Sequence, residues 1–78
     1  MELYTAAWCD PCKQLKRWLE QKGIEVTIID IDEQPEKVKG RKIRSLPTLV
    51  LDNYETRVGN EQIRPYLEEL HASTMPNT

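Results

Sequence analysis

The stretch Trp8-Cys9-Asp10-Pro11-Cys12 contains both cysteines of the chain and follows a short apolar run at the N-terminus. A disulfide between two cysteines three positions apart closes a very short loop, so it removes little entropy from the unfolded chain. The pair is therefore a poor structural staple. In a reducing compartment it is better suited to reaction than to bracing.

A helix is predicted to begin at these cysteines. From Asp10 to Lys22 the sequence has helical periodicity, which Gly23 ends. Pro11 fits the first helical turn, because the N–H groups there have no partner within the helix. Cys9 is then at or near the cap, where the positive end of the helix dipole stabilises a thiolate. The predicted apolar stripe consists of Cys12, Leu15 and Leu19.

The rest of the first half predicts two strands and a weak helix. Glu2–Thr5 is a candidate strand, and residues 24–32, rich in β-branched side chains, form a second strand parallel to it. The polar stretch from Glu33 to Arg44 predicts a short helix that starts at Pro35 and ends at Gly40. The opening is therefore a βαβ unit.

The second half predicts a hairpin and a final helix. Thr48–Leu51 is a strand, and Asp52-Asn53 supplies the turn into an edge strand over Glu55–Val58. Gly59 ends that strand, and Asn60 is the predicted N-cap of the last helix. The buried stripe of that helix is predicted to consist of Ile63, Tyr66, Leu67 and Leu70.

These elements predict an α/β fold in the order β-α-β-α-β-β-α. Its four-stranded mixed sheet has the order 2-1-3-4 and is flanked by three helices, the first and third on one face and the second on the other. We expect one domain over residues 1–71 and a flexible tail at 72–78, where periodicity is absent.

The charge composition of the chain argues against nucleic acid and acidic membranes as binding partners. The chain has 78 residues with 11 Lys and Arg against 13 Asp and Glu, so no overall field attracts nucleic acid or an acidic membrane surface. No segment has the roughly 18 consecutive apolar residues that span a bilayer, and the first residues lack the layout of a signal peptide. We expect a monomer in the cytoplasm that binds neither nucleic acid nor membrane.

The spacing of the cysteines indicates dithiol chemistry. The sulfur of Cys9 is expected to be exposed at the helix end, which makes Cys9 the attacking thiol. Cys12, one turn further and more buried, resolves a mixed disulfide. The same spacing is half of a zinc site, but the chain has one histidine, His71, and no third cysteine. A closed four-ligand site is therefore not available in one chain, and no metal is expected.

Three motifs resemble the thioredoxin superfamily: Trp8-Cys9-Asp10-Pro11-Cys12-Lys13 is similar to the thioredoxin active-site run, Leu46-Pro47-Thr48 to the cis-proline segment, and Val58-Gly59 to the turn before the last helix. The size of the chain is similar to that of glutaredoxins and of the small redoxins that reduce ribonucleotide reductase. The resemblance covers residues 1–71. It implies a dithiol–disulfide oxidoreductase with the thioredoxin fold.

The resemblance also implies roles for individual residues. A cis Leu46–Pro47 bond leaves the backbone of Leu46 open to β-like pairing with an extended substrate. Trp8 is expected to give a flat contact surface over the disulfide. The residues expected to support the cysteines are Trp8, Asp10, Pro11 and Lys13. The residues expected to bind substrate are Leu46, Pro47, Thr48, Val58 and Gly59.

The partners implied by resemblance are a disulfide-containing protein, for which ribonucleotide reductase is a candidate, and an external reductant. That reductant is either thioredoxin reductase with NADPH or glutathione, and no bound cofactor is expected beyond the Cys9–Cys12 disulfide itself. Two other functions stay open. One is a glutathione-dependent glutaredoxin, and the other is a non-catalytic binding subunit of a larger enzyme.

Some positions depart from the resemblance. Leu3 and Ile28 stand where thioredoxins have a buried acid and its lysine, so that proton shuttle is missing. Asp10 stands where thioredoxins have glycine, and its carboxylate is expected to disfavour a Cys9 thiolate. Asp30, Asp32 and Glu33 are interpreted as a strand end. A run of basic residues precedes Leu46-Pro47 and consists of Lys37, Lys39, Arg41, Lys42 and Arg44. It is interpreted as a solvated face, and the alternative is that it contacts the carboxylates of glutathione or an acidic partner tail.

Overall fold

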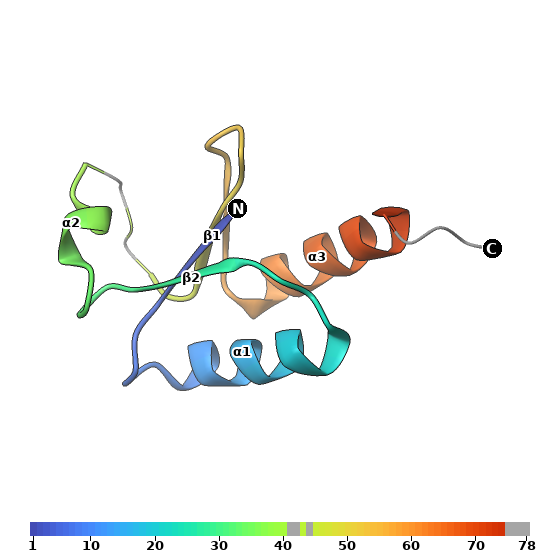
Figure 1. Cartoon of the computed structure of the whole chain (residues 1–78), viewed down its shortest axis with the longest axis horizontal. Coiled ribbons are helices and arrows are strands. Elements are labelled where there is room, and N and C mark those ends of the chain that lie inside the picture. The colour runs from blue at the N-terminus through green and yellow to red at the C-terminus, as the bar shows by residue number, and fades with distance from the viewer. Residues whose placement is uncertain (41–42, 44, 75–78) are drawn as a thin grey trace.

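The computed structural model of the chain describes residues 1–40, 43 and 45–74. Their elements follow one another in the predicted order (Figure 1). They are β1 (Glu2–Thr5), α1 (Asp10–Lys22), β2 (Thr27–Asp30), α2 (Pro35–Val38), β3 (Thr48–Val50), β4 (Thr56–Val58) and α3 (Asn60–Thr74). The prediction β-α-β-α-β-β-α is confirmed.

The strands form one four-stranded sheet in the order β2-β1-β3-β4. β1 pairs in parallel with β2 and antiparallel with β3, so that Leu3 lies between Ile28 and Leu49. β3 pairs antiparallel with β4. This confirms the predicted mixed sheet, with β1 and β3 at its centre.

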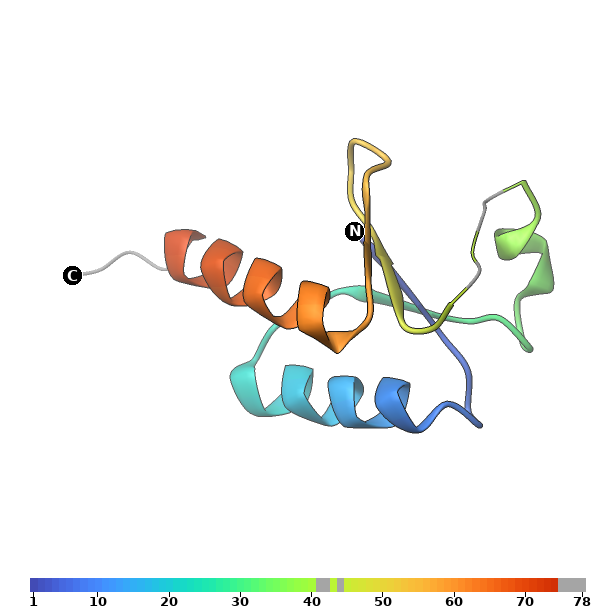
Figure 2. The ribbon, with the colours of Figure 1, turned by 180° about the vertical axis from the view of Figure 1, so that it is seen from behind.

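The two faces of the sheet carry different helices. Figures 1 and 2 show α1 and α3 side by side on one face, with α2 on its own at one end of the molecule. Leu3 and Tyr4 are consecutive on β1, so their side chains point to opposite faces. The core under α1 and α3 consists of Leu3, Leu15, Leu19, Leu49, Leu51, Ile63 and Leu67. On the opposite face Val38 of α2 packs against the buried cluster of Tyr4, Ile29 and Val50.

The second strand is shorter than predicted and lies at the edge of the sheet. Ile29 is 2 % exposed, whereas the preceding Ile28 is 40 % exposed. Ile28 shares the α1 face with its partner Leu3, but it lies at the outermost strand, where cover is incomplete. The apolar residues of β2 form a pattern that is typical of an interior strand. In the structure, however, β2 is an edge strand that pairs only with β1.

The prediction that Asn60 caps the last helix is wrong. The Ile63 N–H donates to the Gly59 carbonyl at 2.9 Å, so Gly59 is the capping residue and Asn60 is the first helical one. The Gln62 side chain reaches back and accepts the N–H of Val58, the residue before the cap, at 3.0 Å, whereas in a capping box it would accept the N–H of the cap residue. At its other end α3 continues to Thr74, beyond the predicted end at His71. Residues 75–78 of the predicted tail lie outside the described residues.

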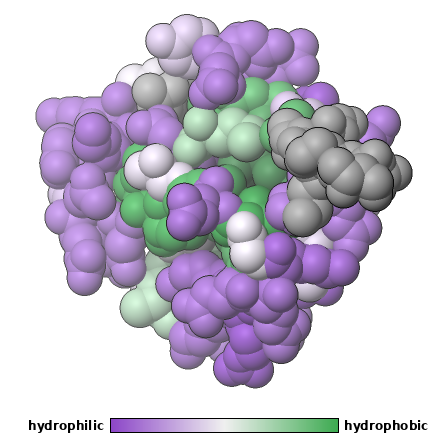
Figure 3. All heavy atoms as spheres, turned by 45° about the vertical axis from the view of Figure 1, so that its right-hand side comes forward, coloured by the Kyte–Doolittle hydropathy of each residue, from purple (hydrophilic) through white to green (hydrophobic). Residues whose placement is uncertain are grey.

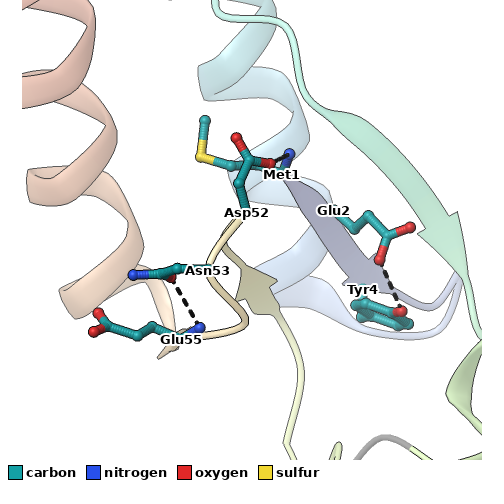
Figure 4. Close-up of polar contacts among 6 residues, drawn as sticks. All are labelled: Met1, Glu2, Tyr4, Asp52, Asn53 and Glu55. Atoms are coloured by element: carbon teal, nitrogen blue, oxygen red, sulfur yellow. Dashed lines mark hydrogen bonds and ion pairs between the residues drawn. The ribbon is translucent and has the colours of Figure 1, made fainter.

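The β3–β4 connection contains the predicted turn residues. The Leu51 N–H donates to the Glu55 carbonyl at 2.8 Å, and the Asn53 side chain accepts the Glu55 N–H at 3.1 Å (Figure 4). In the same figure the amino group of Met1 contacts the Asp52 carboxylate at 2.8 Å. The start of β1 and the hairpin turn therefore lie together at one end of the sheet.

The face drawn in Figure 3 is mostly hydrophilic. A smaller apolar area lies between the hydrophilic residues on this face. Over the described residues no helix is both long and apolar enough to cross a membrane.

Tyr54 in the hairpin turn has φ 69°, a left-handed backbone that favours glycine. We predict that Tyr54→Gly is more stable than Tyr54→Ala by about 1 kcal/mol, because both variants remove the ring and only glycine relieves the backbone. Urea unfolding of the two variants measures this difference. Equal unfolding free energies would contradict it.

Candidate active site

The two cysteines lie at the start of α1. Cys9 is the N-cap, and its sulfur accepts a hydrogen bond from the Cys12 backbone N–H at 3.3 Å. The Lys13 N–H donates to the Cys9 carbonyl at 3.1 Å, so the first helical turn is closed around Cys9. Both cysteines are free thiols. The predicted helix start, with Pro11 in the first turn, is confirmed.

The prediction that the Cys9 sulfur is exposed is wrong. Cys9 is 6 % exposed and Cys12 is fully buried. They form a cluster with Ala6, against which Ile31 and Leu46 pack. These two apolar side chains come from segments far along the chain, and they leave only a small part of Cys9 accessible.

Cys12 is held in its protonated form. Burial and, to a smaller extent, the hydrogen bond with Cys9 together raise its pKa from 9.0 to about 12, against the opposing effects of a backbone hydrogen bond from Ala6 and of the Lys16 charge. Cys12 is therefore a thiol at neutral pH.

A cleft of about 570 Å³ opens beside Cys9. Its lining comes from the start of α1, the end of β2, α2 and the segment before β3. Five predicted site residues line it: Trp8, Cys9, Asp10, Pro11 and Leu46. Four further lining residues were not predicted: Ile31, Val38, Ile43 and Ser45. The lining that the described residues provide is therefore mainly apolar, apart from Asp10 and Ser45.

Trp8 forms one wall of the cleft and is 66 % exposed. Its indole Nε1–H donates to the Asp32 carboxylate at 2.8 Å. The Asp30 carboxylate in turn accepts the backbone N–H groups of Asp32 and Glu33, at 2.8 and 3.3 Å. Of the acids interpreted from sequence as a strand end, Asp32 therefore orients the tryptophan and Asp30 holds the backbone at Asp32, roles that the sequence did not indicate.

The proline segment lies against the start of α3. The Leu46–Pro47 peptide bond is cis, and the Pro47 carbonyl accepts the Gly59 N–H at 2.9 Å. Thr48 pairs with Val58, and its hydroxyl donates to the Ser45 carbonyl. The predicted substrate-binding residues are thus neighbours, although among them only Leu46 lines the cleft.

Asn60 connects this segment to the cysteines. Its amide Nδ2 donates to the Pro11 carbonyl at 3.4 Å, so the first residue of α3 contacts the first turn of α1. Asn60 was predicted as a helix cap, and no local pattern in the sequence indicates its contact with Pro11.

The charged residues near the cysteines lie at the surface. Asp10 is the first residue of α1 and pairs with Lys13 at 3.8 Å, with both side chains exposed. Lys37 and Lys39 of the basic run are exposed and do not line the cleft. Three other members of that run, Arg41, Lys42 and Arg44, lie outside the described residues. In the described part of the chain, no three acidic, histidine or cysteine side chains gather to hold a metal ion.

The fold and the helix-cap dithiol define the chain as a small thiol–disulfide oxidoreductase of the thioredoxin superfamily. The family model described as Glutaredoxin matches residues 1–56, and the chain belongs to that family. Members act through a redox-active cysteine pair without a prosthetic group, on disulfide substrates and with a reductase or thiol as electron donor.

Curated relatives carry the name thioredoxin. The thioredoxin of Rickettsia typhi is 29% identical over 90% of this chain and 76% of its own length, and that of Rickettsia prowazekii is 30% identical over the same shares. The thioredoxin of Mycobacterium tuberculosis is 35% identical over 62% of this chain and 47% of its own length. No solved structure matches the chain.

The raised pKa of Cys12 predicts a loss of stability in alkali. The unfolded chain releases the Cys12 proton near pH 9, whereas the folded chain keeps it up to about pH 12. The folded state therefore holds more protons in this interval, and the unfolding free energy of the reduced protein falls as pH rises from 9. We expect a steeper fall for the reduced wild type than for Cys12→Ala in urea titrations, whereas parallel curves would contradict the assignment.

The Trp8–Asp32 hydrogen bond predicts a second measurable effect. In Asp32→Ala the Trp8 indole N–H loses its acceptor, so its proton resonance should move upfield and exchange faster with solvent. Glu33→Ala, which removes a neighbouring exposed acid that has no contact with the indole, should leave the resonance in place. Nuclear magnetic resonance measures the indole N–H chemical shift and exchange rate in both variants, with the Trp18 indole as internal reference. An unchanged Trp8 signal in Asp32→Ala would disprove the contact.

Proposed function

We propose that the chain reduces protein disulfides, with Cys9 as the nucleophile and Cys12 as the resolving thiol. The observation that carries this assignment is the asymmetry of the pair. Cys9 lines the cleft, whereas Cys12 is fully buried and its pKa is raised to about 12. Only the thiolate attacks a disulfide, so the residue held as a thiol is the second to react.

In the first step the Cys9 thiolate attacks one sulfur of the substrate disulfide. A mixed disulfide forms between Cys9 and that sulfur, the substrate S–S bond breaks, and the other substrate sulfur leaves as a thiolate that takes up a proton. The apolar cleft beside Cys9 holds the chain that carries the attacked sulfur.

In the second step Cys12 loses its proton and attacks Cys9. The Cys9–Cys12 disulfide forms, and the remaining substrate sulfur leaves and is protonated. The substrate thus gains two electrons from the cysteine pair and two protons, one released by Cys12 and one from solvent. Leu3, at the position of the thioredoxin acid, is buried among apolar residues and accepts no proton. The departing substrate thiolate or water then takes the Cys12 proton.

An external reductant returns two electrons to the Cys9–Cys12 disulfide. The family supplies two candidates of different chemistry, a thioredoxin reductase with NADPH and glutathione. The relatives named thioredoxin favour the first, and the glutaredoxin family model favours the second. A reducing compartment such as the cytoplasm suits this chemistry, and by resemblance ribonucleotide reductase is a candidate substrate.

Substitution of each cysteine tests the assignment. With insulin as the disulfide substrate and NADPH coupled through either recycling system in turn, Cys9→Ser should reduce the rate to that of the protein-free reaction. Cys12→Ser should stop after the first step and accumulate the mixed disulfide on Cys9, seen by mass spectrometry as the mass of one substrate chain. The system that supports steady turnover of the wild type identifies the reductant.

The outcome also separates catalysis from a binding role. If the chain served only as a subunit of a larger enzyme, Cys9→Ser would leave the activity of that enzyme unchanged. Retained disulfide reduction in Cys9→Ser, or a mixed disulfide on Cys12 in place of Cys9, would overturn the proposal.

A further inference from the structure

Asp10 brings a carboxylate to the lining of the cleft beside Cys9. Of the described residues that line it, Asp10 has a charged side chain, and the others are apolar or neutral apart from the reacting Cys9. Cys9 itself is 6 % exposed and lines this cleft, so the cleft gives a substrate sulfur a route to it. The group next to the reacting sulfur in the substrate chain therefore passes close to Asp10.

The Asp10 carboxylate is available to such a group. Its side chain is 85 % exposed, and it pairs only loosely with Lys13, at 3.8 Å. Lys13 does not line the cleft, whereas Asp10 does. A second carboxylate, that of Asp32, is bound to the cleft wall at Trp8. A substrate in the cleft therefore lies beside the Asp10 carboxylate, whereas Lys13 is outside the described lining.

We propose that Asp10 determines substrate specificity: it selects polypeptide disulfides with a lysine or arginine beside the reacting cysteine and disfavours anionic disulfides such as that of glutathione. The proposal rests on the disulfide reduction proposed above and names the class of substrate for that site. Asp10 acts through its charge at the cleft and takes no part in the bond changes.

The expected size of the effect follows from simple electrostatics. Two unit charges about 4 Å apart in water change an association constant by about fivefold. A cationic and an anionic substrate therefore differ by about tenfold in kcat/KM, once part of the attraction is offset by Lys13. The difference should shrink in 1 M salt, where the screening length is about 3 Å.

Two disulfide peptides test this, identical except for lysine or glutamate directly before the reacting cysteine. The readout is the ratio of kcat/KM for the lysine peptide to that for the glutamate peptide. Because the reactivity of the Cys9 thiolate enters both rates equally, it cancels in the ratio, and only selection by charge remains. Low salt and a fixed pH are used throughout.

Substitutions of Asp10 and of Lys13 are expected to change the kcat/KM ratio in opposite directions. Wild type should show a ratio of about ten, which Asp10→Asn lowers to near one and Asp10→Glu restores. Lys13→Gln should raise the ratio, because it removes the compensating charge. Glu69→Gln changes the net charge as Asp10→Asn does, but on the exposed side of α3, and should leave the ratio unchanged.

Three results would overturn the proposal: an Asp10→Asn ratio equal to that of wild type, a ratio near one in wild type, or an equal change from Glu69→Gln. Loss of activity toward both peptides in every protein, wild type included, would instead refute the proposed disulfide reduction. Faster reduction of both peptides by Asp10→Asn at a constant ratio would show that Asp10 acts on the Cys9 thiol and selects nothing.

Discussion

The hydrogen bond from the Cys12 backbone N–H to the Cys9 sulfur fixes where α1 begins. Once Cys9 is the cap, helical periodicity places Cys12 on the stripe that continues through Leu15 and Leu19 into the core under α1 and α3. The two cysteines therefore have different environments: Cys9 lines the cleft, and Cys12 is fully buried.

The site is completed by a segment some forty residues away. Pro47 and Gly59 are joined by a backbone hydrogen bond, which ties the segment before β3 to the start of α3. Asn60 then contacts the Pro11 carbonyl across the helix start. Two separate parts of the chain thus meet at the cysteines, and the sheet order that places β1 beside β3 makes this meeting possible.

Elements with a clear local pattern could be predicted from the sequence, and contacts that need the assembled fold could not. The periodicity around Leu15, the turn at Asp52-Asn53 and the proline motif at Leu46-Pro47 predicted the architecture and most of the site. The bond from Asp32 to Trp8 and the burial of Cys9 depend on distant segments that pack together, and no local pattern encodes them. The Asn60 cap was wrong because asparagine and glycine both suit that position, and the backbone at Gly59 decided between them.

The proposed dithiol chemistry and the proposed recognition of substrate use parts of the molecule that differ in how many buried residues anchor them. The dithiol belongs to a helix of 13 residues anchored by a buried stripe, whereas α2 has four residues and none of them is buried. Yet α2 supplies Val38 to the wall of the cleft. The same reactive unit can therefore acquire a new partner range through exchange of a short surface segment, with the electron-transferring core of the fold left as it is.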